Sequence, residues 1–141
     1  DTEYIIIKMP QFNQVQERLK SYGAKLDSIS NKKIKEYDLK VKAFNDESKT
    51  LSDADKKIKY AEIGKLNQDL VKFRENGTKM MQIKKGDFMR PLYKKITDLT
   101  AIIAKEKGYT QILTTTGNEF AYIDDRFDIT KLVLTKLGIK E

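Results

Sequence analysis

The sequence contains no cysteine, no histidine and no tryptophan among its 141 residues. The lack of thiols and imidazoles excludes disulfides, cysteine nucleophiles, Cys/His zinc sites and Ser-His-Asp triads. Catalysis would have to rely on carboxylates, lysines or tyrosines, and no carboxylate pair occurs in a recognisable motif. We therefore expect a protein that is not an enzyme and that uses no cofactor or metal.

Prolines and long apolar runs are also scarce. There are only two prolines, the mean hydropathy is −0.62, and no apolar run approaches the roughly 20 residues of a membrane-spanning helix. The first residues, Asp1-Thr2-Glu3, do not resemble a signal peptide. Leu, Ile, Phe and Tyr nevertheless recur too regularly for a disordered chain, so the composition indicates one soluble, helix-rich domain.

Apolar residues recur at alternating spacings of three and four along two long stretches, as in the seam of a coiled coil. The first stretch contains Phe12, Val15, Leu19, Tyr22, Leu26 and Ile29, and continues after a five-residue step with Ile34, Tyr37, Val41 and Phe44. The second contains Ile63, Leu66, Leu70 and Phe73, and resumes with Met89, Leu92, Ile96, Leu99 and Ile103. Turn residues at 45–48 and candidate N-caps at 52–55 separate the stretches, which predicts a helical hairpin over residues 10–90 with its tip near 45–53.

The second helix contains residues that weaken it. Gly64, Gly77 and Gly86 each cost about 1 kcal/mol relative to alanine, and Pro91 removes a backbone donor. This pattern indicates either a poor local helix or a hinge at Gly77, Gly86 and Pro91.

The predicted fold class is α+β and mostly α, with the helical hairpin on a small α/β body formed by residues 1–9 and 91–141. Residues 111–115 and 120–123 are β-prone, and Gly117-Asn118 between them suits a hairpin turn. Asp128 or Thr130 can cap a final helix from Ile129 to Leu137. A lone β-hairpin is marginal in water, so the predicted sheet requires further strands.

Positive charge is concentrated in one segment. Residues 72–97 contain eight Lys and Arg side chains against two acids, which accounts for +6 of the net charge of +7. Such a stretch attracts nucleic acid, anionic lipid or acidic protein, although it also fits a solvated helix face.

Several segments together resemble the OmpH/Skp family of periplasmic chaperones over nearly the whole chain. They are Asp1-Thr2-Glu3-Tyr4-Ile5-Ile6 with Met9-Pro10, then Ile102 to Tyr109, Ala121-Tyr122-Ile123, Asp128-Ile129-Thr130, and Val133 to Gly138. The resemblance implies a homotrimer in which each subunit gives strands to a β body and extends one helical hairpin, or tentacle. It further implies a periplasmic holdase that works without ATP and holds unfolded outer-membrane proteins between the tentacles. In this family a strand precedes the position of Asp1, so residues 1–9 correspond to the segment that links it to the tentacle.

A holdase needs adaptable apolar contacts together with reversible electrostatic attraction. The client-binding candidates are Tyr37, Tyr60, Met80, Met81, Lys72, Arg74 and Lys79. Lys84, Lys85 and Arg90 are candidates for contact with anionic lipid or another acidic surface. Met80 and Met81 are adjacent in a helix and cannot both face one seam, so at least one should be accessible.

Two other functions fit the pattern less well. A coiled-coil adaptor would dock its hairpin against one specific partner. A basic coiled coil that binds nucleic acid would need basic side chains aligned with phosphates, whereas the lysines here are interspersed with acids. We therefore expect no nucleic-acid partner. The acidic segment 124–128 lacks the glycine and the distal glutamate of a calcium loop.

Overall fold

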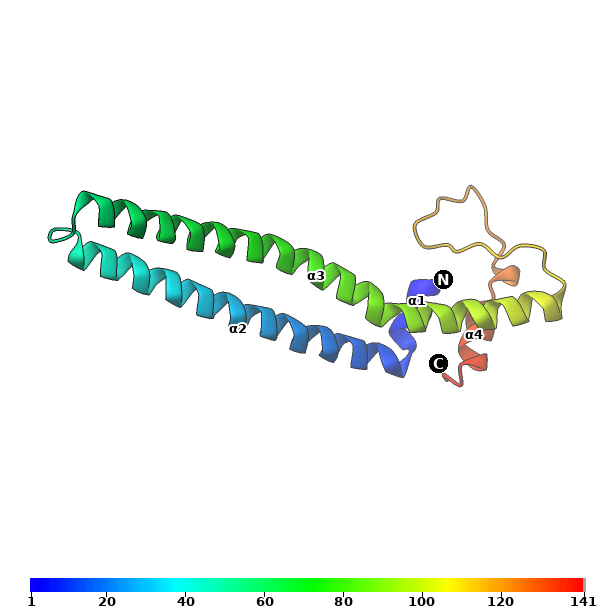
Figure 1. The fold of residues 1–141 in the computed structure, drawn as a ribbon. Coiled ribbons are helices and arrows are strands. Elements are labelled where there is room, and N and C mark those ends of the chain that lie inside the picture. The colour runs from blue at the N-terminus through cyan, green and yellow to red at the C-terminus, as the bar shows by residue number, and fades with distance from the viewer. Residues whose placement is uncertain (141) are drawn as a thin grey trace. The chain divides into compact units, whose positions relative to one another are not determined.

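A computed structural model describes residues 1–140 of the chain, and all regular structure in them is helical. The helices are α1 (Thr2–Lys8), α2 (Pro10–Glu47), α3 (Asp53–Lys107), the short 3₁₀ helix η1 (Asp125–Phe127) and α4 (Thr130–Lys136) (Figure 1). The predicted long helical hairpin is present as α2 and α3. None of the helices in the described residues is long and apolar enough to cross a membrane.

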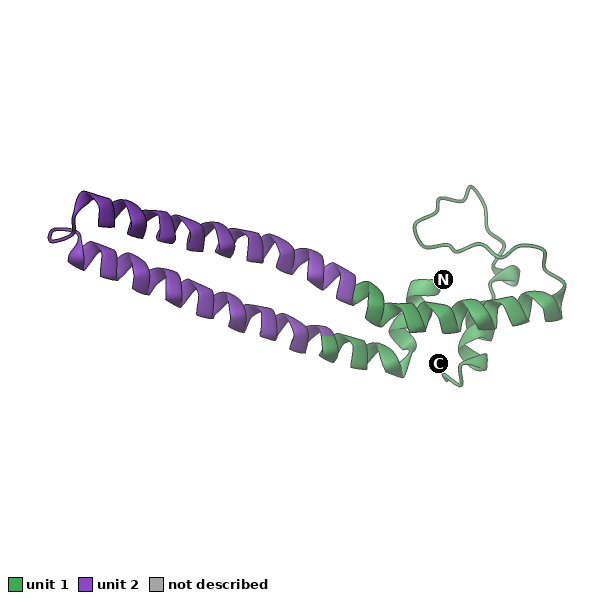
Figure 2. Ribbon diagram, in the orientation of Figure 1, with its two compact units in different colours: residues 1–18, 85–141 green, residues 19–84 purple. Residues whose placement is uncertain are grey.

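The chain divides into two compact units (Figure 2). Unit 1 contains residues 1–18 and 85–141, and unit 2 contains residues 19–84. Both long helices run through both units. Unit 2 is therefore a simple antiparallel pair of helix segments joined by the turn at residues 48–52.

Unit 1 contains most of the fully buried apolar side chains. On α3 a buried stripe at spacings of three and four includes Met89, Leu92 and Ile96, and ends at Ile103, which is 0% exposed. Helix α4 contacts α1, and the core is completed by Ile5, Ile6, Met9, Val15, Val133 and Leu134. This compact core is a set of helix faces, each contributing a narrow apolar stripe.

Unit 2 is held by a thinner seam between α2 and α3. Leu70 is the one buried apolar residue in residues 19–84, while the other seam residues are half-buried. Ion pairs flank this seam, including Lys40 with Glu62 at 3.8 Å and Lys59 with Glu47. Exposed pairs of this kind contribute little stability, so unit 2 depends on partial burial along its whole length.

The predicted position of Ile29 in the seam is wrong. Ile29 is 43% exposed, and the half-buried residues after Leu26 are Ser30 and Lys33. The seam therefore continues at regular spacing through two polar residues instead of taking a five-residue step. Lys33 is accommodated because its ammonium nitrogen lies 5.7 Å from the centre of the Phe73 ring, a cation–π contact.

The ends of the helices follow local capping chemistry. Ser52 Oγ accepts a hydrogen bond from the backbone N–H of Asp55 at 3.1 Å, which starts α3. Gly108 ends α3 with φ +70°, and the N–H of Tyr109 then reaches the carbonyl of Ala104 at 2.9 Å. Gly138 ends α4 in the same left-handed conformation, which glycine adopts without steric cost.

The predicted β body is wrong. No strand occurs in residues 1–140, and the two β-prone segments lie in an irregular stretch where Leu113 is 67% and Tyr122 81% exposed. The turn between them does form, with Gly117 at φ +75°. β-Prone side chains alone do not stabilise a two-stranded hairpin that has no apolar face to bury. Residues 1–9, expected to link a strand to the tentacle, instead contain α1.

Asp128 should make the stability of unit 1 depend on pH. Its carboxylate accepts the backbone N–H of Thr130 at 2.8 Å at the start of α4, and hydrogen bonding to Thr130 lowers the pKa of Asp128. A lowered pKa means that this contribution is present above the unfolded-state value of about 3.9 and is lost as the pH falls further. Asp128→Ala should cost about 1 kcal/mol of unfolding free energy at pH 6, the typical net value of one hydrogen bond, and less at pH 3.

Thermal unfolding at the two pH values measures this difference. Asp125→Ala is the matched control, because Asp125 is an exposed acid in the same segment. An equal loss in Asp128→Ala at both pH values would assign the effect to something other than the ionised carboxylate.

Candidate functional site

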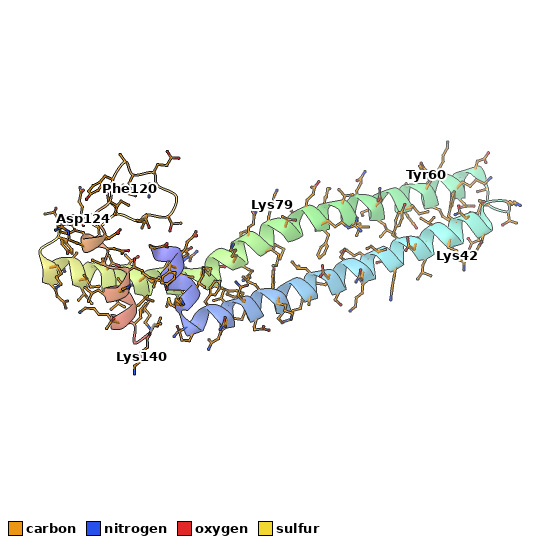
Figure 3. All side chains as sticks on the ribbon, turned by 180° about the vertical axis from the view of Figure 1, so that it is seen from behind. Lys42, Tyr60, Lys79, Phe120, Asp124 and Lys140 are labelled. Carbon is orange, nitrogen blue, oxygen red and sulfur yellow. The ribbon has the colours of Figure 1, made fainter. Side chains whose placement is uncertain are left out.

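The basic segment of α3 begins in unit 2. Lys72, Arg74 and Lys79 are exposed, and within residues 1–140 none of the three forms an ion pair (Figure 3 labels Lys79). Lys72 and Lys79 are seven residues apart and share one face of the helix, about two turns from each other. Their charges are therefore available to an external partner.

The basic segment continues in unit 1 with partly compensated charge. Lys84, at the end of unit 2, is half-buried, whereas Lys85 and Arg90 are exposed. Arg90 pairs with Asp87 at 3.2 Å, and Lys94 pairs with Asp98 at 2.7 Å. These i,i+3 and i,i+4 pairs reduce the charge that this part of the helix presents.

The adjacent methionines point in different directions, as the helical geometry requires. Met80 is 42% exposed and Met81 is half-buried. A Cβ placed on Gly23 of α2 would lie 3.8 Å from Met81 Cε, which places Met81 at the seam of unit 2. Met80 is therefore the accessible member of the pair.

The two candidate tyrosines also differ in exposure. Tyr60 is 72% exposed near the hairpin tip, and its ring centre lies 6.5 Å from that of Phe44 (Figure 3). Tyr37 is half-buried in the seam. The client-binding candidates thus lie along unit 2 and do not converge on one pocket, since Tyr60 and Lys72 alone are separated by about 18 Å of helix.

One flank of unit 2 carries apolar residues that the sequence pattern did not assign to it. Ile29 lies three helical turns before Lys40, and Met80 lies five turns after Glu62. Because Lys40 and Glu62 pair across the helices, both apolar residues fall on that same flank. The observed seam takes a second step of four residues after Leu26, to Ser30 and then Lys33, which leaves Ile29 outside it.

The proposed hinge residues lie inside one continuous helix. Gly77, Gly86 and Pro91 are all within α3, and neither glycine has positive φ. Gly77 is half-buried at the seam, whereas Gly86 is exposed. A hinge at these positions stays a prediction.

The acidic segment 124–128 forms local contacts. Asp124 accepts from the backbone N–H of Arg126 at 3.0 Å and pairs with its guanidinium at 2.5 Å. The hydrogen bonds between these side chains lower the pKa of Asp124 and raise that of Arg126. No cluster of three or more acidic side chains suited to a metal ion occurs in residues 1–140.

Comparison with models of protein families identifies the family of this chain. The model of the family described as outer membrane protein (OmpH-like) matches residues 1–137. The chain belongs to the OmpH family. The proteins of this family are non-enzymatic periplasmic chaperones, so membership indicates a chaperone-like role for this chain. A comparison with curated proteins finds no match.

Family membership also bears on partners and compartment. OmpH-family proteins act in the periplasm, and the family as a whole is associated with unfolded outer-membrane proteins. The family match covers both units, including the irregular stretch between α3 and α4.

Proposed function

We propose that this OmpH-family chain is an ATP-independent periplasmic holdase that keeps unfolded outer-membrane proteins from aggregating. The observation that carries this proposal is the surface of unit 2. Lys72, Arg74 and Lys79 present unpaired positive charge there, and Ile29, Tyr60 and Met80 add accessible apolar surface.

This combination suits partners that share little sequence. Several shallow apolar contacts bind many different segments weakly, and methionine and tyrosine side chains adapt to varied shapes. Charge attraction reaches about 8 Å at physiological salt and remains reversible. Binding of this kind needs no ATP, because no single contact is strong enough to prevent release.

We further propose that copies of the chain associate as a homotrimer and that the client lies in a cavity between their hairpins. Support comes from the apolar side chains that unit 1 exposes between α3 and α4. These are Leu113, Phe120, Tyr122, Ile123 and Phe127, each at least 37% exposed. Several exposed apolar side chains in one short segment suit an interaction surface.

Lys84, Lys85 and Arg90 are proposed to contact anionic lipid. Lys85 and Arg90 are exposed, although Arg90 already pairs with Asp87. Each lysine side chain contributes about 1 kcal/mol of binding free energy near an anionic lipid surface.

Light scattering of a urea-unfolded outer-membrane barrel, diluted into buffer with the chain, tests the holdase proposal. We expect the chain to keep the barrel soluble and its apparent affinity to fall as sodium chloride rises from 50 to 500 mM, roughly tenfold or more, because salt screens exposed charges. Sucrose at matched osmolality is the control.

Size-exclusion chromatography with light scattering on the same samples reports assembly. An affinity unchanged by salt would remove the electrostatic part of the mechanism. A stable trimer that ignores the barrel would instead favour an adaptor that docks one specific partner.

A further inference from the structure

Two glycines of unit 2, Gly23 on α2 and Gly77 on α3, line the same hollow between the helices. Neither has positive φ, so the backbone does not require glycine at either position. A Cβ on Gly77 would meet no atom within 4 Å, and one on Gly23 would meet only Met81 Cε at 3.8 Å. Alanine would fit at both positions and would favour the helix more. Each glycine therefore leaves space in the hollow that a Cβ would otherwise occupy.

This glycine hollow has a volume of about 230 Å³. Its walls are formed by Leu26, Phe73 and Met81, and its polar lining by Asp27, Ser30, Arg74 and Thr78. A cavity of about 150 Å³ lined by aliphatic and aromatic side chains is large enough to bind benzene. The glycine hollow is partly open to solvent, unlike that enclosed cavity, and its volume is sufficient for a phenyl ring.

The chemistry of the hollow selects among apolar ligands. Its charged residues are one acid and one base, Asp27 and Arg74, so it has no net charge with which to select an anionic head group. Together with Thr78 they offer both hydrogen-bond donors and acceptors, which matches the N–H and C=O groups of a peptide. Met81 at the wall is flexible and polarizable, and sulfur–aromatic contacts are favourable.

We infer that the glycine hollow is a subsite for one aromatic side chain of an extended polypeptide. The absence of Cβ atoms lets the ring enter between α2 and α3, while the polar lining meets the adjoining peptide groups. The inference rests on the proposed function to the extent that this polypeptide is an unfolded client.

Methyl NMR of the full chain, labelled with ¹³C at its methionine methyl groups, tests the subsite. The probe is N-acetyl-phenylalaninamide, and N-acetyl-alaninamide is the matched compound without a ring. We expect a saturable shift of the Met81 signal with the first compound only. Met80, which is adjacent and exposed, reports binding to the outer surface of unit 2 outside the hollow, and Met9 in the unit 1 core should not shift.

Gly77→Leu fills the glycine hollow with a good helix former, and Gly64→Leu is its control. Gly64 is exposed on the same helix, and a Cβ there would meet no atom within 4 Å, so both variants gain helix propensity equally. We expect Gly77→Leu to weaken the binding of N-acetyl-phenylalaninamide at least tenfold and Gly64→Leu to leave it unchanged. Both should melt no lower than the parent chain.

The absence of a Met81 shift, an equal shift of Met80, or binding retained in Gly77→Leu would overturn the inference. The barrel aggregation assay keeps it separate from the proposed function. A Met81 response to the aromatic amide in a chain that does not protect the barrel would reject the holdase and support the subsite. Protection of the barrel without any Met81 response would support the holdase and reject the subsite.

Discussion

Ile103→Ala is expected to lower the free energy of unfolding by about 2–5 kcal/mol, the range for truncating a large buried aliphatic side chain. Ile103 is 0% exposed at the end of the buried stripe on α3. The substitution leaves a cavity that the surrounding packed helices can only partly close. Small domains have about 5–15 kcal/mol of total stability. The expected loss is therefore a large fraction of the stability of unit 1.

Urea unfolding followed by circular dichroism, at one fixed protein concentration, measures the loss. The adjacent residue provides a control of identical chemistry, because Ile102 is 46% exposed. Ile102→Ala should cost less than about 1 kcal/mol. Equal losses in the two variants would mean that Ile103 is not a core residue under the conditions of the experiment.

Reversal of three unpaired positive charges of the 72–97 segment, in the triple variant Lys72→Glu, Arg74→Glu and Lys79→Glu, is expected to weaken client binding about tenfold or more at low salt. Each reversal changes the net charge by two, so the total falls from +7 to +1. The loss should shrink as salt rises, because screening removes the attraction in the parent chain. Fluorescence anisotropy of a labelled unfolded barrel measures the affinity.

The control is a second triple variant with the same net charge, Lys35→Glu, Lys42→Glu and Lys57→Glu. These lysines are exposed on the same unit but outside the 72–97 segment. We expect a smaller loss of affinity. An equal loss in both variants would show that total charge matters and that the position of the segment does not.

The hairpin could be predicted from the sequence because its determinants are local and repeated. Apolar spacing of three and four indicates where a helix buries a stripe, and the capping of α3 by Ser52 depends on neighbours in the chain. Gly108 and Gly138 end helices for an equally local reason, their left-handed φ. Long elements of this kind need little information from distant residues.

The irregular stretch after α3 could not be predicted in the same way. The apolar side chains of residues 111–123 suit strands, but strand formation depends on a partner to pair with and on a face to bury. Neither is encoded in the segment itself. Helix α1 is not evident from the sequence either. It has only seven residues, and the burial of its apolar side chains depends on contact with α4, which is distant in the chain.

Within the candidate site, the exposure of a single side chain is easier to predict from the sequence than the set of residues that lie together. Adjacency alone requires that Met80 and Met81 diverge, and they do. The predicted position of Ile29 is wrong because two polar residues, Ser30 and Lys33, occupy the seam where the spacing favours an apolar residue. Lys33 is stabilised there by the Phe73 ring on the other helix, a contact that no spacing rule within α2 can reveal.

The thin seam of unit 2 has a consequence for cooperativity. With Leu70 as its one fully buried apolar residue, unit 2 can separate its helices over a few turns at small free-energy cost while the core of unit 1 remains intact. Such partial openings recur through thermal motion alone. In the proposed holdase, they would let the hairpin yield to differently shaped clients and then release them, with unit 1 acting as the part of the chain that stays folded.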